Sequence, residues 1–370
     1  MRLILLFLTI LISFDSFSQD ANELYNSGVD KFNLKNYKGA IGDFTEVVKL
    51  NPEDFEAFYN RGLSKSKLQD FSGAIVDYTE AIELHPEYYT AYKNRGIATY
   101  NLKNYEEAIE DYNKAIEINS SFKKAYFNRG QAKFKLQKFQ EALDDYTKAI
   151  ELNLFKSEVY FSRGVVKLEM QDCKGAIADF NKAIEIQPDF FKAYNNRGYA
   201  KAYIDNYKEA INDYTKAIEF NPTYYEAYNN RGVAKRNLQK YQEALADHTK
   251  AIELNPEFYD AYYNRGFTKD DIQSYNEAID DYTKAIQLNQ TFTDAYYNRG
   301  LSKHNIQNYK EAIEDYTKAI QLDPNFTEAF YNRGLAKINI EQIDSGCIDF
   351  SKAEEMGYQQ ASAALRQYCD

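Results

Sequence analysis

The sequence of 370 residues is poor in several residue types, and each shortage narrows the function. It has no tryptophan, only three cysteines and only three histidines, which are His85, His248 and His304. No Ser/His/Asp set, metal-ligand spacing or glycine-rich phosphate loop is present. The sequence therefore predicts a protein that is not an enzyme and that holds no metal and no cofactor.

A basic surface stripe is also lacking. The formal net charge is −11, and acidic and basic residues are mixed throughout the chain. Proteins that bind nucleic acid neutralise phosphates with clustered Lys and Arg. We therefore expect no nucleic acid among the partners.

Only one long apolar run occurs, from Leu3 to Phe14, and it follows Met1-Arg2. With the small residues Ser16 and Ser18, it predicts a secretory signal peptide over 1–18. The alternative is an uncleaved membrane anchor, although a span needs about 20 apolar residues. We expect a mature chain without a transmembrane segment, exported to the periplasm or envelope of a bacterium.

Glycine is sparse but strictly placed. Ten glycines recur every 34 residues, a period that marks stacked supersecondary repeats. Ten repeats over 21–358 follow, starting at 21, 55, 89, 123, 157, 191, 225, 259, 293 and 327. The glycines are Gly28, Gly62, Gly96, Gly130, Gly164, Gly198, Gly232, Gly266, Gly300 and Gly334.

Each repeat predicts two amphipathic helices. Apolar residues recur every three or four residues, as in Ala278, Tyr282 and Ala285. All six prolines share one position, where they stop the second helix. They are Pro52, Pro86, Pro188, Pro222, Pro256 and Pro324.

This pattern, with Tyr92-x2-Arg95-Gly96 followed by Ala108, Tyr112 and Ala115, resembles the tetratricopeptide repeat (TPR) family. The resemblance covers nearly all of the chain after the apolar run. It implies an all-α, right-handed superhelical solenoid of ten helix-turn-helix repeats with a concave inner surface. We read the amphipathic segment within 359–370 as a C-terminal capping helix.

The glycines predict a close approach of the two helices in a repeat. A glycine inside a helix costs about 1 kcal/mol relative to alanine, so ten would cost roughly 10 kcal/mol without such a reason. Gly198→Leu is expected to disrupt the array locally.

Arginine precedes the glycine in nine repeats, and aspartate lies sixteen residues after that position in all ten. We interpret these residues as structural ion pairs within a repeat or between neighbours. As exposed pairs they would contribute only about 0.2–1 kcal/mol each. The alternative is a basic ladder for an anionic ligand. Representative pairs are Arg197 with Asp213, Arg265 with Asp281 and Arg299 with Asp315.

The cysteines suggest a staple at the C-terminus. Cys347 and Cys369 flank the turn at Gly357, so a disulfide is one hypothesis and two buried free thiols the other. Cys173 replaces an aromatic residue of other repeats, which predicts a buried, inert thiol.

An asparagine two residues before the glycine recurs in nine repeats. In some members of the family that the chain resembles, such a ladder holds an extended peptide backbone. Amide side chains can also bond within or between helices, so a structural role is an equal alternative.

Two neighbouring positions vary, giving two aromatic stretches around a more polar middle. We expect the C-terminal stretch to dominate partner binding, because buried aromatic residues dominate interface energies. The predicted groove residues are Asn196, Tyr199, Asn230, Tyr263, Asn264, Phe267, Tyr297, Asn298, Leu301, Tyr331, Asn332 and Leu335.

Together these features predict a non-enzymatic scaffold that binds an extended peptide or a helix of a partner protein in its groove. A glycan or small-ligand carrier of the cell envelope is one alternative. A self-assembling structural protein, with weak self-association through its ends, is another.

Overall fold

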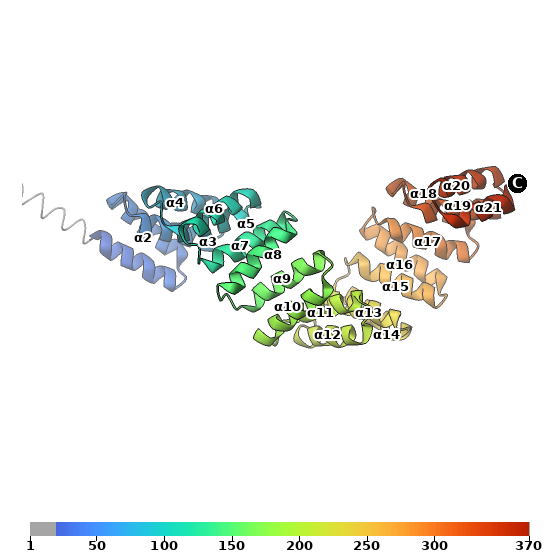
Figure 1. Cartoon of the computed structure of the whole chain (residues 1–370), viewed down its shortest axis with the longest axis horizontal. Helices are drawn as coiled ribbons and strands as arrows, with labels where there is room; N and C mark the ends of the chain where they lie inside the picture. The colour runs from blue at the N-terminus through green and yellow to red at the C-terminus, as the bar shows by residue number, and fades with distance from the viewer. Residues whose placement is uncertain (1–19, 370) are drawn as a thin grey trace, which may run out of the picture. The chain divides into compact units, whose positions relative to one another are not determined.

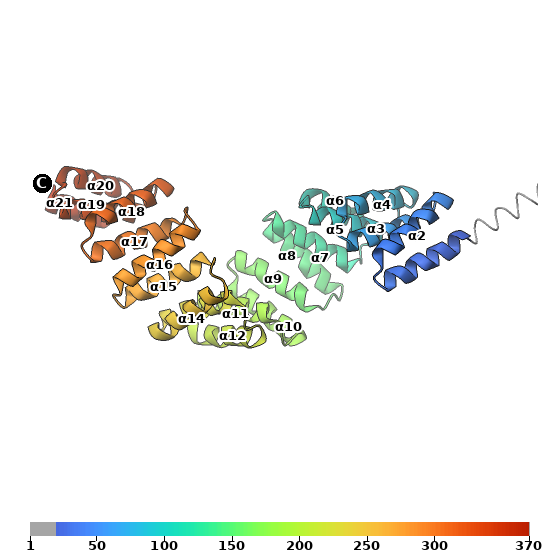
Figure 2. The same cartoon turned by 180° about the vertical axis from the view of Figure 1, so that it is seen from behind.

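The computed structural model describes residues 20–369, so the predicted signal peptide lies outside the described residues (Figure 1). The chain forms two compact units that divide between Ile186 and Gln187. Within each unit, successive helices pack side by side, as both views show (Figures 1 and 2).

In the first unit, residues 20–33 are helical. The helices that follow are α2 (Tyr37–Leu50), α3 (Phe55–Lys67), α4 (Phe71–Leu84), α5 (Tyr89–Asn101), α6 (Tyr105–Ile118), α7 (Lys123–Lys135), α8 (Phe139–Glu151), α9 (Ser157–Glu169) and α10 (Cys173–Ile186).

The second unit contains α11 (Phe191–Tyr203), α12 (Tyr207–Phe220), α13 (Tyr225–Asn237), α14 (Tyr241–Leu254), α15 (Tyr259–Asp271), α16 (Tyr275–Leu288), α17 (Thr293–Asn305), α18 (Tyr309–Leu322), α19 (Thr327–Asn339), α20 (Ile343–Glu355) and α21 (Gln359–Tyr368). The described part of the chain has no strand. The predicted all-α array of consecutive helix pairs is confirmed.

The turn inside each repeat is built without glycine. In the second repeat, Gln69 takes a left-handed φ of 64° just after α3, and its N–H donates to the carbonyl of Ser66. The next N–H, of Asp70, reaches back to the carbonyl of Lys65. These two bonds satisfy helix-end carbonyls that would otherwise lack donors. The carboxylate of Asp70 then caps α4 by accepting from the N–H of Gly73 at 2.9 Å.

The regular 34-residue spacing of the glycines has a steric cause. A Cβ added to Gly198 would lie 2.9 Å from Cε1 of Tyr214, a ring on the second helix of the same repeat. The predicted close approach of the two helices is therefore present, and the neighbour is an aromatic ring.

The arginines bind aspartate within their own repeat. Arg265 Nη2 lies 2.6 Å from Asp281 Oδ1, and its Nε donates to Oδ2 at 2.9 Å. Its Nη1 donates to Thr249 Oγ1 in the preceding repeat at 3.1 Å, and Lys269 Nζ lies 2.8 Å from Asp281 Oδ2. The same contacts join Arg299 to Asp315, and Arg197 pairs with Asp213.

These pairs are largely buried, which differs from the exposed pairs that the sequence suggested. The Asp281 side chain is only 6 % exposed and that of Arg265 only 20 %. Removing one partner of a buried pair strands the other charge, so these pairs fix the register of each repeat. The guanidinium groups bind aspartates in their own repeats, so their charges are already neutralised. This pairing disfavours the alternative of a basic ladder for an anionic ligand.

The C-terminal end is closed by α21, which buries Ala361 and Ala364. Cys347 and Cys369 form a disulfide with their Cα atoms 5.8 Å apart, and it joins α20 to the residue after α21. Cys173 is a free thiol, 6 % exposed, and burial raises its pKa.

Candidate functional site

One position on the first helix of each repeat decides where the surface is filled and where it is hollow. Three residues before the glycine, seven of the ten repeats carry Tyr or Phe. Each of these rings packs on the core ring of its own repeat, with centroids 5.7–5.9 Å apart. The seven residues are Tyr25, Tyr59, Phe127, Phe161, Tyr263, Tyr297 and Tyr331.

The asparagine ladder fastens these tyrosines between repeats. Asn298 Nδ2 donates to the hydroxyl of Tyr263 at 2.8 Å, and Asn332 Nδ2 donates to that of Tyr297 at 2.9 Å. Asn60 and Asn94 do the same in the first unit. At least one amide hydrogen of each of these four asparagines therefore serves a structural role between repeats, which was one of the two alternatives that the sequence left open.

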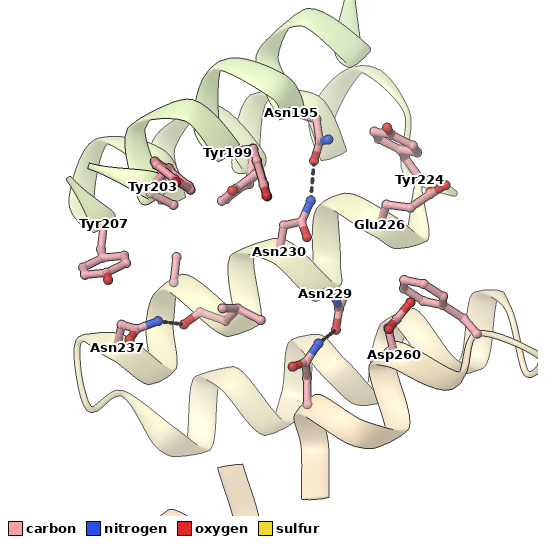
Figure 3. Close-up of a pocket in the computed structure, with 16 residues that line it drawn as sticks. Asn195, Tyr199, Tyr203, Tyr207, Tyr224, Glu226, Asn229, Asn230, Asn237 and Asp260 are labelled. Atoms are coloured by element: carbon pink, nitrogen blue, oxygen red, sulfur yellow. Dashed lines mark hydrogen bonds between the residues drawn. The ribbon is translucent and has the colours of Figure 1, made fainter. Parts of the chain in front are cut away.

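Three repeats lack the aromatic ring and carry Lys93, Asn195 or Asn229 instead. Asn195 and Asn229 stand in neighbouring repeats of the second unit, and a cavity of about 790 Å³ opens beside them (Figure 3). Its walls come from α11, α12, α13, α15 and the turns before α13 and α15. They are Asn195, Tyr199, Ala202, Tyr203, Tyr207, Tyr214, Tyr224, Glu226, Asn229, Asn230, Val233, Ala234, Asn237, Phe258, Asp260 and Asn264.

The cavity is rich in aromatic rings that reach solvent. Tyr199 is 51 % exposed and Tyr203, one helical turn later on α11, is 58 % exposed. Tyr207 and Tyr224 stand at other edges of the hollow (Figure 3). Such rings offer faces for stacking and hydroxyls for hydrogen bonds.

The floor of the cavity is an amide network. Asn230 Nδ2 donates to Asn195 Oδ1 at 3.1 Å, and Asn264 Nδ2 donates to Asn229 Oδ1 at 3.2 Å (Figure 3). Thus the two asparagines replace the tyrosine hydroxyls as acceptors. Burial lowers the pKa of His248, which lies under Asn229, to about 3. His248 Nδ1 lies 3.0 Å from Asn229 Oδ1, and because an amide oxygen accepts, this hydrogen bond requires the neutral tautomer with its proton on Nδ1.

Two carboxylates, Glu226 and Asp260, face this hollow at equivalent positions of successive repeats. Oε2 of Glu226 is buried and has no hydrogen-bond partner among the described residues. Burial, and then Glu226, raise the pKa of Tyr224 to about 12, and burial raises the pKa of Asp260. No Lys or Arg lines this cavity.

The structure brings only some of the predicted groove residues together here. Tyr199, Asn230 and Asn264 line the cavity, and Asn196 contacts its edge by accepting from Asn195 at 3.2 Å. The predicted C-terminal aromatics are largely engaged in packing. Tyr263 packs on Phe292 at 4.8 Å, Tyr297 on Phe326 at 4.6 Å and Tyr331 on Tyr358 at 5.0 Å. Leu301 packs on the core cluster around Tyr316, Phe267 lies under the Arg236 guanidinium, and Leu335 is half-buried.

Sequence reasoning missed Asn195 and Asn229, the two residues that open the cavity, and the carboxylates Glu226 and Asp260. The available signal was the loss of an aromatic residue in two consecutive repeats. From the sequence, this loss predicts only a more polar middle between two aromatic stretches.

Among residues 20–369, no helix is long and apolar enough to cross a membrane. The same residues contain no cluster of His, Cys, Asp or Glu suited to a metal ion.

Comparison with known proteins agrees with the repeat pattern. The tetratricopeptide repeat model matches residues 55–88, 89–122, 124–153, 191–224, 225–258 and 293–326. A second TPR repeat model matches residues 166–202 and 271–307. No curated protein is similar enough to count as a match.

Solved structures share the fold. A tetratricopeptide repeat protein from Parabacteroides merdae is 20 % identical, with a TM-score of 0.52, over 68 % of this chain and 99 % of that chain. The Cut9–Hcn1 hetero-tetramer of the APC/C gives 14 % identity and a TM-score of 0.52, over 95 % of this chain and 96 % of that one. YrrB, described as a TPR protein with an unusual peptide-binding site, is 26 % identical over 50 % of this chain and 95 % of its own, with a TM-score of 0.45.

The matched repeats account for more than half of the chain, and the helix pairs, glycines and register agree with them. Arrays of this kind are non-catalytic scaffolds for protein interactions. The chain belongs to the tetratricopeptide repeat family.

Proposed function

We propose that this chain holds an extended peptide segment of a partner protein along the first helices of its second unit, with one side chain in the cavity beside Asn195 and Asn229. The observation that carries the proposal is the loss of two consecutive aromatic rings. Full burial of such a ring stabilises a protein by about 1.5–3 kcal/mol. The absence of two such rings lowers the stability of the array, so selection for stability alone does not explain it.

The polar groups left on the cavity wall suit a peptide backbone. Asn230 and Asn264 each use one amide hydrogen on the preceding repeat. Their Oδ1 atoms and second amide hydrogens remain as one acceptor and one donor each, which is the complement of a main-chain peptide group. The exposed rings of Tyr199 and Tyr203 supply apolar area beside them.

The proposal is tested by filling the cavity with the residues that other repeats use. Asn195→Tyr, Asn229→Tyr and His248→Tyr together rebuild the ring pairs seen at Tyr263 and Tyr282. Peptides are selected from a random display library on the wild-type full chain, and their Kd values are measured by calorimetry. We call this triple substitution the filled variant. We expect it to raise the Kd of the peptides at least tenfold, because the new tyrosine rings occupy the cavity.

The matched control is Lys93→Tyr, which restores a ring at the equivalent position of the first unit. It should leave the Kd of the same peptides unchanged. Peptides that bind the filled variant as tightly as the wild type would contradict the proposal, provided that circular dichroism shows both variants folded.

A second candidate is a glycan, because exposed tyrosines next to asparagines and carboxylates also suit sugar rings. The filled variant separates the two functions. Soluble cell-wall fragments that raise the melting temperature of the wild type, but not of the filled variant, would favour the glycan.

We further propose that the protein is exported. The basic start and apolar run of residues 1–14 support this, and so does the Cys347–Cys369 disulfide, since disulfides persist in oxidising compartments. The mass of the mature chain tests it: cleavage after Ser18 is the expected result.

A further inference from the structure

We infer that the cavity of the second unit recognises a basic side chain, arginine or lysine, of the bound peptide. This inference rests on the proposed function and adds the chemical class of the ligand. Two independent features of the cavity carry it: its carboxylates, which no Lys or Arg of the lining neutralises, and its aromatic walls.

The carboxylates have lost the group that faces them elsewhere in the array. The acidic position lies 31 residues after the aromatic position, and in the first repeats Tyr25 donates its hydroxyl to Glu56 at 3.4 Å. The pKa of Tyr263 is raised to about 12, first by burial and then by the charge of Asp294. The pKa of Tyr297 is also raised to about 12, first by burial and then by the charge of Glu328. Those acids therefore lie close to a tyrosine hydroxyl.

At Glu226 and Asp260 the corresponding residues are Asn195 and Asn229, which have no hydroxyl and reach less far. The amide nitrogen of Asn195, which could donate to a carboxylate, instead donates to Asn196 Oδ1 at 3.2 Å. Glu226 Oε2 is buried without a donor in the described part of the chain, although the neighbouring Tyr225 hydroxyl interacts with the same carboxylate group. No Lys or Arg of the cavity lining faces Glu226 or Asp260. A buried acceptor without a donor is costly, so a donor supplied by a ligand is favoured.

The rest of the cavity matches the body of a basic side chain. Tyr199, Tyr203, Tyr207, Tyr224 and Phe258 supply ring faces. A guanidinium or ammonium group is attracted to such faces, and the alkyl part of the side chain packs on them. A cation inside this cavity donates to Glu226 Oε2 and is attracted by two negative charges. A neutral amide such as Gln can donate but lacks that charge attraction, and an ionised acidic side chain has no donor to offer.

The molecule already contains one contact of this type. The Arg236 guanidinium lies 4.0 Å from the centre of the Phe267 ring, and its Nε lies 3.0 Å from Asp271 Oδ2. The arrangement of one ring face and one carboxylate therefore holds an arginine within the second unit itself.

The test uses the full chain and four sub-libraries of twelve-residue peptides that differ only in a fixed central Arg, Lys, Gln or Glu. We expect binders from the Arg or Lys sub-libraries. Replacing the central Arg or Lys of a selected peptide by Gln should raise its Kd at least tenfold. The variant Glu226→Gln/Asp260→Asn should raise the Kd of the basic peptide by a similar factor and remove the difference between the basic and Gln peptides.

The matched control is Asp294→Asn/Glu328→Gln, which makes the same charge change at the same repeat position beside Tyr263 and Tyr297. It should bind the basic peptide within twofold of the wild type. The inference is overturned if the Gln peptide binds within twofold of the basic one, or if the Glu226/Asp260 variant binds like the control. If the inference is overturned but the filled variant still binds the peptides more weakly than the wild type, the proposed function stands. If the filled variant binds them as tightly as the wild type, the proposed function fails as well.

Discussion

The cavity at Lys93 in the first unit and the cavity at Asn195 and Asn229 in the second arise in the same way but carry opposite charge. In both, the first helix of a repeat has lost its aromatic residue. The first-unit cavity has a volume of about 340 Å³ and three lysines in its walls. It is lined by Lys93, Ile97, Lys124, Phe127, Asn128, Leu154, Lys156, Glu158 and Val159.

The two hollows differ in what replaces the ring. Lys93 is a half-buried cation, and burial together with Lys124 lowers its pKa to about 8. The asparagines of the second unit are neutral, and the charged groups of that cavity are the carboxylates Glu226 and Asp260 of the following repeats. In the first unit the residue that replaces the ring is itself charged, whereas in the second unit the charge comes from carboxylates of the following repeats.

The loop before α9 completes the first cavity. Leu154 occupies the position of the six prolines and is only 5 % exposed, while Asn153 takes a left-handed φ of 64°. A single irregular connection thus adds an apolar wall to a basic site.

The largest expected effect concerns the scaffold that both units share. Asp111 is bound by Arg95 alone, whereas Asp281 is bound by Arg265 and Lys269. We expect Arg95→Ala to lower the free energy of unfolding by about 3–5 kcal/mol, because it strands a buried carboxylate, and Arg265→Ala to cost less. Urea denaturation measures both, and Lys114→Ala, in an exposed pair with Glu117, should cause no measurable change. If Arg95→Ala and Arg265→Ala lower the free energy of unfolding equally, Lys269 does not compensate for the loss of Arg265.

An intermediate effect is expected at Lys93. Lys93→Phe should stabilise the chain by about 1–3 kcal/mol at pH 7, because it removes a half-buried charge and restores a ring. The folded pKa of about 8 lies below the ordinary value of 10.5, so the folded state loses this proton first. Wild-type stability therefore rises relative to the variant between about pH 8 and pH 10.5.

Urea denaturation at pH 7 and pH 10 tests this, with Asn195→Phe as the comparison in the second unit. The advantage of Asn195→Phe should not depend on pH in that range. An advantage of Lys93→Phe that stays constant with pH would contradict the role of the charge.

The smallest effect tests the ladder in both units. Tyr59→Phe and Tyr263→Phe remove the hydroxyls that accept from Asn94 and Asn298, which are both 8 % exposed. Each should cost about 1 kcal/mol, since a buried amide hydrogen loses its acceptor. Tyr126→Phe, which removes an exposed hydrogen bond to the Ser120 carbonyl, should change the melting temperature little. If only one of Tyr59→Phe and Tyr263→Phe lowers the stability, the asparagine ladder stabilises only the unit that contains that tyrosine.

Much of the fold could be predicted from the sequence because the repeat is local and periodic. The spacing of Gly198, Arg197 and Asp213 predicted a close helix pair and an ion pair, and both are present. The pairing of Cys347 with Cys369 was one of two hypotheses, and the structure has the disulfide.

The candidate site was predicted only in part, because it depends on what is missing between repeats. The sequence predicts Tyr199, Asn230 and Asn264 as groove residues, and all three line the cavity. It does not indicate that the rings of Tyr297 and Tyr331 pack on Phe326 and Tyr358. Exposure of an aromatic side chain depends on its neighbours 19 to 35 residues away, which the pattern of one repeat does not contain.

The sequence by itself determined the helix pairs, their register and the residues that hold each pair together, since these depend on contacts that recur every 34 residues. Only the tertiary structure decided where the surface is hollow and which carboxylates lack a partner. The physical reason is that a cavity depends on the volume of several side chains from successive repeats, and one ring lost at Asn195 changes the surroundings of Glu226 in the next repeat.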